Sequence, residues 1–256
     1  MAETAQPSNS AFRLDGKIAL VTGGASGIGQ ATVRELASAG ARVYIADFNI
    51  EGATALAAEL SDAHPLYMDV TNPDSIAVAF QQIPTLDILV NNAGIGHVGD
   101  IMHTELEDVA RMLDVNVKSV FLVTRAAFPM LLESHGSIVN IGSVAGLIGI
   151  KHRLAYCTSK GAVIAMTRQI AVDYPKELRI NCICPATVDT PFVESYLNKY
   201  HAHEKDKVKA EVTARQPIGR LGKAEEIASM VRYLSSNEAA FINGAVLPID
   251  GGWTAA

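Results

Sequence analysis

The sequence predicts an α/β fold: a single doubly wound domain with a mainly parallel sheet of about seven strands and helices on both faces. Short apolar runs alternate with segments that carry apolar residues at helical spacing along most of the chain. These runs contain few polar residues, which is expected when helices cover both faces of a parallel sheet. No linker-like composition and no internal repeat divides the 256 residues, so we expect one domain.

The predicted elements begin with a strand at Lys17–Val21, a glycine-rich turn, and a helix at Gln30–Ala39 that Gly40 ends. The same order of strand and helix then recurs along the chain. The further elements are Ala41–Ala46 then Glu51–Leu60, Pro65–Met68 then Asp74–Ile83, Asp87–Val90 then Glu105–Leu132, Ser137–Ile141 then Ala155–Tyr174, the strand Leu178–Cys184, the helix Lys223–Leu234 and the strand Ala245–Ile249.

Two segments stand apart from this alternation. Residues 1–13 are expected to form a flexible N-terminal tail, and residues 14–256 the folded domain. Residues 190–216 are the least regular part of that domain and include the charged stretch His201–Lys209. A solvated helix face accounts for such charges. The alternative is a lid over a substrate, because the segment follows the carboxyl end of a strand, where open α/β sheets bind ligands.

Composition excludes several classes of protein. Hydrophobic residues make up 49% of the chain and charged residues 19%, which is typical of a globular protein. The net charge of −6 lacks the basic excess of a nucleic-acid-binding protein. We find no apolar run near the ~20 residues of a membrane span, no secretory signal at Met1–Ser10, and three cysteines, which cannot all pair. We therefore expect a reduced, cytoplasmic protein with no nucleic-acid or membrane partner.

The turn after the first strand carries glycines in the pattern Gly23-x-x-x-Gly27-x-Gly29. Between a strand and a helix, the backbone N–H groups of such a turn and the helix dipole can hold a pyrophosphate. Glycine suits this position because a Cβ would block positive φ or the approach of phosphate. A tight packing turn is the alternative interpretation. Asp47, which ends the second strand, favours the pyrophosphate-binding interpretation. It lies 18 residues past Gly29, near the ~20 expected for an acid that binds the adenosine ribose.

Asp47 also predicts which dinucleotide is bound. Its carboxylate would repel the additional phosphate of NADP, and neither Ser26 nor Phe48 offers a cation to offset that repulsion. We therefore predict NAD as the cofactor.

Tyr156 and Lys160 lie four residues apart in a predicted helix, so their side chains share one face. Free tyrosine titrates near ~10, so a tyrosine that acts as a base at neutral pH needs a positive charge close by. Ser143 follows the strand Ser137–Ile141 and lies at the carboxyl edge of the sheet, where its hydroxyl can hold a substrate oxygen. A tyrosine and a lysine at this spacing are by themselves more often a plain surface pair.

In combination, these residues resemble the short-chain dehydrogenase/reductase family, in order and over nearly the whole chain. The motifs that carry the resemblance are Thr22-Gly23-x-x-x-Gly27-x-Gly29, Asn91-Asn92-Ala93-Gly94, Asn116, Ser143 and Tyr156-x-x-x-Lys160. The resemblance implies a Rossmann-like fold and a homotetramer formed through the long predicted helices around Glu105–Leu132 and Ala155–Tyr174. It also implies that Tyr156 is the general acid/base and that Ser143 orients the substrate oxygen. Lys160 would bind the nicotinamide ribose and make the phenol of Tyr156 more acidic. Asn116 would hold a water of the proton relay.

The same resemblance implies the cofactor contacts. Asp69-Val70 matches the contact to the adenine ring, and Asn91–Gly94 the segment along the adenosine. Pro185–Thr190 matches the segment that receives the nicotinamide amide, with Ala186 in place of the usual glycine; a positive φ there would strain alanine by about 1–2 kcal/mol. The expected cofactor residues are Gly23, Ser26, Gly27, Ile28, Gly29, Asp47, Phe48, Asp69, Val70, Asn92, Ala93, Gly94, Tyr156, Lys160, Pro185, Val188 and Thr190.

The substrate is predicted from Arg153, three residues before Tyr156, because a planar guanidinium on the catalytic face suits a carboxylate. Arg153-x-x-Tyr156, Cys184–Pro191 and Asp250–Trp253 resemble the branch of cytosolic type-2 hydroxybutyrate dehydrogenases and bacterial sugar-acid dehydrogenases. We therefore expect an NAD-dependent oxidation of a small hydroxy acid or sugar-derived acid.

Ser143, Arg153 and Tyr156 are the expected substrate residues, and Arg215 is a second candidate for the carboxylate. A solvent-facing Arg153 is the alternative interpretation, and with it the substrate is a neutral sugar or polyol. A protein that only senses NAD is the alternative without catalysis.

His97, in the loop after Gly94, is a further candidate for the pocket, although a loop histidine is more often solvated. We assign no metal, because no cysteine or histidine pair has convincing ligand spacing.

Overall fold

Seven strands form one parallel sheet in the order β3-β2-β1-β4-β5-β6-β7. The structure is a computed structural model that describes residues 11–200 and 202–256. The chain moves outward from β1 to β3 and then crosses to β4, which is the doubly wound topology predicted from the sequence. The strands are β1 (Ile18–Thr22), β2 (Arg42–Asp47), β3 (Ala63–Tyr67), β4 (Ile88–Asn91), β5 (Ser137–Ile141), β6 (Arg179–Pro185) and β7 (Val246–Ile249).

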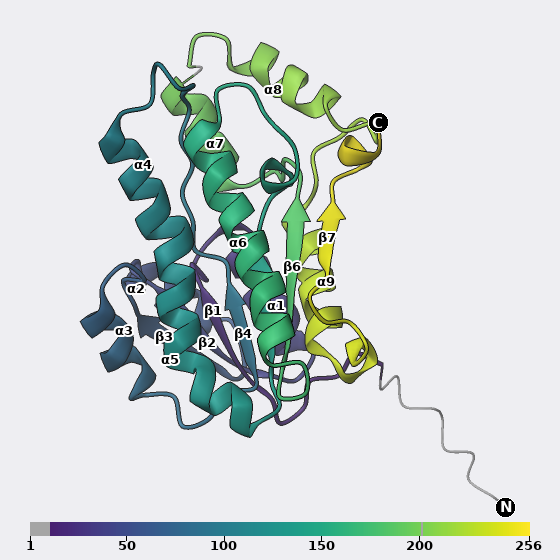
Figure 1. The fold of residues 1–256 in the computed structure, drawn as a ribbon. Helices are drawn as coiled ribbons and strands as arrows, with labels where there is room; N and C mark the ends of the chain where they lie inside the picture. Colours follow the sequence, from purple (N-terminus) through teal and green to yellow (C-terminus); the bar gives the residue numbers. More distant parts are fainter. Residues whose placement is uncertain (1–10, 201) are drawn as a thin grey trace, which may run out of the picture.

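Helices cover both faces of the sheet (Figure 1). The α-helices of the described residues are α1 (Gly27–Ser38), α2 (Ile50–Ala57), α3 (Pro73–Phe80), α4 (Leu106–Leu113), α5 (Ser119–Glu133), α6 (Leu154–Asp173), α7 (Pro191–Tyr200), α8 (Lys205–Ala214) and α9 (Ala224–Ser235). One core cluster packs α1, α2 and α9 against the sheet, and a second packs α3, α5 and the end of α6 against the opposite face. Within one strand, Val139 and Ile141 belong to the first cluster and Ile138 to the second, because successive side chains alternate between the faces.

The predicted helix Glu105–Leu132 is interrupted in the structure. A π-helical segment, Asp114–Lys118, separates α4 from α5 and contains Asn116, one of the predicted site residues. Such segments insert a residue into a helix and often occur at functional sites. The apolar spacing along this segment does not indicate the break.

The expected lid, residues 190–216, contains two helices, α7 and α8. They lie at the carboxyl edge of the sheet, at the top of Figure 1. Leu197 of α7 packs with Val208 and Val212 of α8 in a small apolar cluster, separate from the two cores of the sheet. His201 lies outside the described residues.

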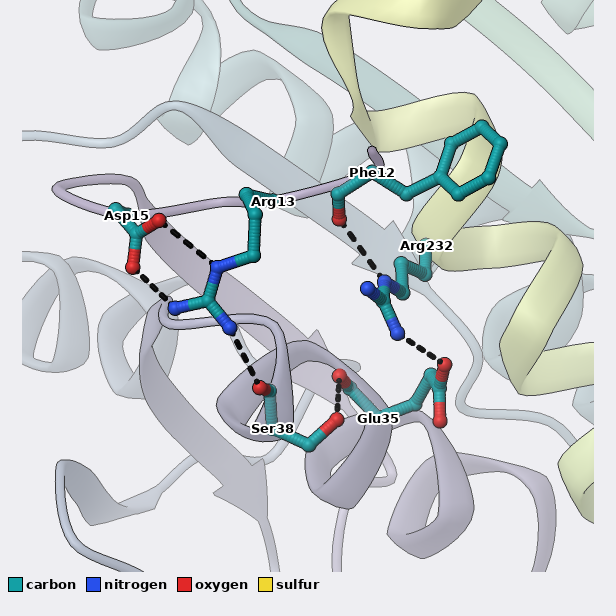
Figure 2. Close-up of polar contacts among 6 residues, drawn as sticks. All are labelled: Phe12, Arg13, Asp15, Glu35, Ser38 and Arg232. Carbon is teal, nitrogen blue, oxygen red and sulfur yellow. Dashed lines mark hydrogen bonds and ion pairs between the residues drawn. The ribbon is translucent and has the colours of Figure 1, made fainter. Parts of the chain in front are cut away.

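The end of the expected flexible tail contacts the domain (Figure 2). Arg232 of α9 donates from Nε to the Phe12 carbonyl at 2.9 Å, and Arg13 donates from Nη1 to the Ser38 carbonyl at 3.2 Å. Phe12 and Arg13 therefore belong with the folded domain. Residues 1–10 of the expected tail lie outside the described residues.

The helical run Leu106–Glu133 is, within the described part of the chain, the one run long and apolar enough to cross a membrane by length and composition. This is weak evidence, because core helices pass the same test. Here Val123, Ala127 and Leu131 are buried in the second core of the sheet.

His135 follows α5 with a φ of 49°, in the left-handed region that favours glycine. His135→Gly is expected to raise the free energy of unfolding by about 0.5–1 kcal/mol, because relief of left-handed strain outweighs the added freedom of the unfolded chain. Thermal unfolding should show a melting temperature higher by about 2 °C. His64→Gly, at a φ that is not positive, is the control and should lower it. A fall with His135→Gly would contradict the assignment of strain.

Candidate active site

A cavity of about 750 Å³ lies along the carboxyl edge of the sheet, where open α/β sheets bind ligands. Every residue predicted to contact the cofactor lines it except Gly29. The lining residues from that set are Gly23, Ser26, Gly27, Ile28, Asp47, Phe48, Asp69, Val70, Asn92, Ala93, Gly94, Tyr156, Lys160, Pro185, Val188 and Thr190. The predicted substrate residues Ser143 and Arg153 line the same cavity.

The glycine turn has the backbone conformation that its sequence predicts. Gly23 has a φ of +62° and Gly27 of +54°, both in the left-handed region. Gly29 lies behind the cavity wall, and a Cβ there would collide with the carbonyl oxygen of Gly23. Asn92 holds the turn from the side, donating from Nδ2 to the carbonyls of Thr22 at 2.9 Å and Gly23 at 3.0 Å. The turn therefore leaves backbone exposed to a ligand where side chains would block it.

Asp47 is 7% exposed at the end of β2. Its carboxylate accepts hydrogen bonds from the backbone N–H groups of Ala25 at 3.0 Å and Asn49 at 2.9 Å. Within the described part of the chain, no lysine or arginine forms an ion pair with this carboxylate. This end of the cavity therefore carries a fixed negative charge without a compensating cation.

Lys160 and Tyr156 lie on one face of α6, as their spacing predicts. The Lys160 ammonium is 5.9 Å from the centre of the Tyr156 ring and donates to the Ile141 carbonyl at 2.9 Å. Lys160 is only 5% exposed, and no carboxylate in the described residues pairs with it. A buried ammonium of this kind favours negative charge on its neighbours.

Ser143 follows β5 and is 8% exposed. Its Oγ accepts a hydrogen bond from the backbone N–H of Ala145 at 3.1 Å. Because a hydroxyl has one donor in addition to its acceptor sites, the Ser143 proton stays available for a ligand in the cavity.

Asn116 lies behind the cavity wall and not on it. Its Nδ2 donates to the Ile95 carbonyl at 3.0 Å and to the Ser159 hydroxyl at 3.1 Å, and its Oδ1 accepts from the Ile95 N–H at 2.8 Å. Both Nδ2 hydrogens of Asn116 are thus engaged with protein groups, and its expected role in holding a water stays a prediction. Here it fixes the loop after β4 against α6, and Ser159 is a partner that the sequence did not indicate.

The other end of the cavity carries two arginines stacked on aromatic rings. The Arg153 guanidinium lies 4.3 Å from the centre of the Tyr196 ring of α7, and that of Arg215 lies 5.8 Å from the ring of Trp253. Both arginines and both rings line the cavity. Arg153 therefore faces the cavity and not open solvent, as the prediction of an acid-binding residue requires. The further lining residues that sequence reasoning missed include Ile95, Arg111, Ile150, Phe192, Val193 and Val212.

The loop after β4 supports Arg153 from behind. The His97 carbonyl accepts from Nη1 of Arg153 at 3.2 Å. The His97 ring does not line the cavity: it is 12% exposed, and its Nε2 lies 3.2 Å from the carboxylate of Asp108. In the same loop, a hydrogen bond from His103 holds the pKa of the Asp100 carboxyl below its usual range.

Pro185–Thr190 runs past the cavity as predicted, and Ala186 is accommodated there. Positive φ among the described non-glycine residues occurs at Phe12, His135 and His152. Ala186 is therefore unstrained, and its N–H donates to the Ile249 carbonyl at 3.1 Å. The strain that a positive φ would cause at this departure from the family pattern does not arise.

A parallel sheet of this order, a glycine turn before α1 and a cavity across the carboxyl edge define a dinucleotide-binding α/β protein. The family described as Enoyl-(Acyl carrier protein) reductase matches residues 23–254. The 2-(S)-hydroxypropyl-CoM dehydrogenase 3 of Xanthobacter autotrophicus is 40% identical over 253 residues, covering 95% of this chain and 98% of that protein. Dehydrogenase/reductase SDR family member 6 of Aquarana catesbeiana is 38% identical over 245 residues, covering 94% and 99%.

A solved structure agrees with these relatives. The ligand-free aldohexose dehydrogenase of Thermoplasma acidophilum has a TM-score of 0.87 and 36% identity, covering 96% of each chain. The chain belongs to the short-chain dehydrogenase/reductase family. It is an oxidoreductase that acts on CH–OH groups, in a family that uses the nicotinamide cofactors NAD and NADP.

Proposed function

We propose that this protein is an NAD(H)-dependent dehydrogenase that transfers a hydride between nicotinamide and the secondary alcohol or ketone of a small hydroxy acid or sugar-derived acid. One observation carries the proposal: the buried Lys160 ammonium has no carboxylate partner in the described residues and lies beside Tyr156 in the cavity. A protein that only binds the cofactor uses the ammonium as a contact to the ribose but does not need a phenol beside it. A proton-transferring site does, because the charge favours the phenolate.

The residues of the cavity fit a dinucleotide. Gly23 and Gly27 line the cavity with φ of +62° and +54°, a conformation that other residues rarely adopt, so this turn presents its backbone to a ligand because it carries glycine. The turn at Gly23–Gly29 would hold the pyrophosphate, Asp47 the adenosine ribose and Lys160 the nicotinamide ribose. When bound, the nicotinamide supplies the chemistry of a two-electron acceptor or donor.

Three side chains of this chain would handle the substrate oxygen. Ser143 donates its free O–H to that oxygen and fixes its position. Tyr156 takes the hydroxyl proton during oxidation and returns it during reduction. Lys160 stabilises the phenolate in both directions, because its charge is buried and therefore weakly screened.

Asp47 supports NAD over NADP. Its carboxylate is buried and pairs with no cation in the described residues, and additional phosphate on the ribose would meet that charge without compensation. Like charges placed together in this way cost several kcal/mol.

Arg153 and Arg215 support an anionic substrate. Both line the cavity that contains Tyr156, and each guanidinium lies over an aromatic ring. Nη1 of Arg153 donates to the His97 carbonyl, and the other N–H groups of its planar fork suit a carboxylate. This favours the branch of hydroxybutyrate and sugar-acid dehydrogenases over that of neutral sugars and polyols.

Arg153→Gln is expected to raise KM for hydroxy acids by about 10- to 100-fold, because a charge-assisted hydrogen bond contributes about 1.5–3 kcal/mol. The corresponding hydroxy amides should show little change. NADH absorbance gives both rates. Arg34→Gln, whose arginine pairs with Glu59 on the surface, is the matched control. Equal KM values for an acid in wild type and Arg153→Gln would show that another group binds the carboxylate.

We further propose a cytoplasmic homotetramer. The tetramer is supported by exposed apolar side chains on the run Leu106–Glu133, among them Leu106 at 77% and Phe121 at 50% exposure. The reducing location is supported by three free thiols, Cys157, Cys182 and Cys184.

A further inference from the structure

A second cavity, of about 290 Å³, lies at the amino edge of the sheet, opposite to the edge that carries Tyr156. It is formed where β4, β5 and β6 begin and where α9 ends. Ile88, Ser137 and Arg179 are the first residues of these three strands, and the parallel register places them side by side. None of its lining residues takes part in the site described above.

Two serines that line this cavity carry buried hydroxyls without a hydrogen-bond partner. Ser137 is 4% exposed and Ser235 is 8% exposed, and neither Oγ has a partner. Ser137 lies on the same face of β5 as Val139 and Ile141, which pack under α9. Ser235 lies in the last turn of α9, so the two serines flank the cavity from the sheet and from the helix that covers it. Buried polar groups of this kind are nearly always satisfied, so an unseen partner is expected here.

The third polar group is the Arg179 guanidinium. It donates from Nη2 to the Ser236 carbonyl at 3.2 Å and from Nη1 to the Ile242 carbonyl at 3.5 Å. No carboxylate in residues 11–200 and 202–256 lies within ion-pair distance of it. Burial lowers the pKa of Arg179, the direction expected for a positive charge that lacks a counter-ion.

The other charges around the cavity leave Arg179 uncompensated. The Asp87 carboxylate accepts from Lys17 Nζ at 2.9 Å and from the Ile18 N–H at 2.9 Å, so Lys17 and Asp87 neutralise each other. At the rim, the opposite charges of Lys176 and Glu177 balance. One positive charge therefore remains in a cavity that is also lined by two serines whose hydroxyls lack a partner.

We propose that this cavity binds the carboxylate or phosphate group of a small metabolite, held by Arg179, Ser137 and Ser235. A guanidinium matches both groups bidentately, and each hydroxyl can donate one further hydrogen bond. An anion there would neutralise the charge of Arg179 and accept a hydrogen bond from each serine hydroxyl. Water can accept the hydrogen bonds but cannot neutralise the charge. This site is independent of the proposed function, because it lies at the other edge of the sheet.

Calorimetric titration of the protein with inorganic phosphate and, separately, with sodium acetate tests the proposal. The protein is first saturated with reduced nicotinamide cofactor, so that the anion cannot enter the glycine turn, and chloride keeps the ionic strength constant. Wild type should bind at least one of the two anions at a saturable site that is separate from any carboxylate binding at Arg153 and Arg215 in the active site. Arg179→Gln and Ser235→Ala should each weaken that binding at least about tenfold, the loss expected for a charged or a buried hydrogen bond.

Arg34→Gln is the control, because it removes an equal charge that already pairs with Glu59 on the surface, and it should bind as wild type does. Binding of phosphate alone identifies a phosphate group as the ligand, and binding of acetate alone a carboxylate. Two results would overturn the proposal: no saturable binding of either anion to wild type, which leaves a cavity filled by water, or equal binding by wild type, Arg179→Gln and Ser235→Ala. Ser235→Ala keeps the test decisive if Arg179→Gln folds poorly.

Discussion

Tyr156→Phe is expected to lower kcat by about 10²- to 10⁴-fold and to leave the Kd for NADH unchanged, because loss of a general acid/base removes a contribution of this size. The ring stays in place, so the packing of α6 and the walls of the cavity are preserved. The phenol oxygen is the single group lost, and with it the proton acceptor beside Lys160. Steady-state rates with a reactive alcohol and fluorescence titration with NADH measure the two quantities separately.

Tyr174→Phe is a matched control at the end of the same helix, where the ring packs edge-on against Phe128 at 4.7 Å and lies outside the cavity. It should behave as wild type. If the parent protein binds NADH but turns over no alcohol, and Tyr156→Phe changes nothing, the protein is a sensor of NAD and the proposed role of Tyr156 is wrong.

Asp47→Asn is expected to shift the ratio of kcat/KM for NAD to that for NADP by about 10²- to 10³-fold toward NADP. Removal of the carboxylate relieves a like-charge repulsion that costs several kcal/mol. The same change weakens NAD binding, because a carboxylate accepts more hydrogen bonds from ribose hydroxyls than an amide does. Parallel kinetics with the two cofactors give the ratio.

Asp69→Asn is the control for this shift. Asp69 lines the same cavity, but its Oδ1 is engaged by the N–H and hydroxyl of Thr71 at 2.9 and 2.7 Å. We expect Asp69→Asn to alter affinity for both cofactors alike and to leave their ratio unchanged. A preference for NADP in the wild type would contradict the role assigned to Asp47.

The sheet was predictable because its strands leave a strong local signal. Ser137–Ile141 is a strand in the structure with the predicted bounds, since a short apolar run between turn residues has few other ways to bury itself. The glycine turn and the pair Tyr156 and Lys160 were predictable for a related reason. Their spacing along the chain fixes their geometry directly, in a tight turn and on a helix face.

Features that depend on contacts between distant segments could not be predicted. The π-helix around Asn116 is held by Ile95 and Ser159, which lie 21 and 43 residues away. The stacking of Arg153 on Tyr196 required the position of α7, and the two residues lie far apart in the sequence. Phe12 was assigned to the tail because its contact with Arg232 of α9 joins residues that lie 220 positions apart in the sequence.

The most direct test of the account is a crystal structure of the protein with NAD and an unreactive analogue of a hydroxy acid. The account predicts that Tyr156 Oη and Ser143 Oγ both lie within about 2.6–3.2 Å of the analogue's hydroxyl oxygen. A Tyr156 ring turned away from that oxygen, with another side chain at hydrogen-bond distance in its place, would contradict it.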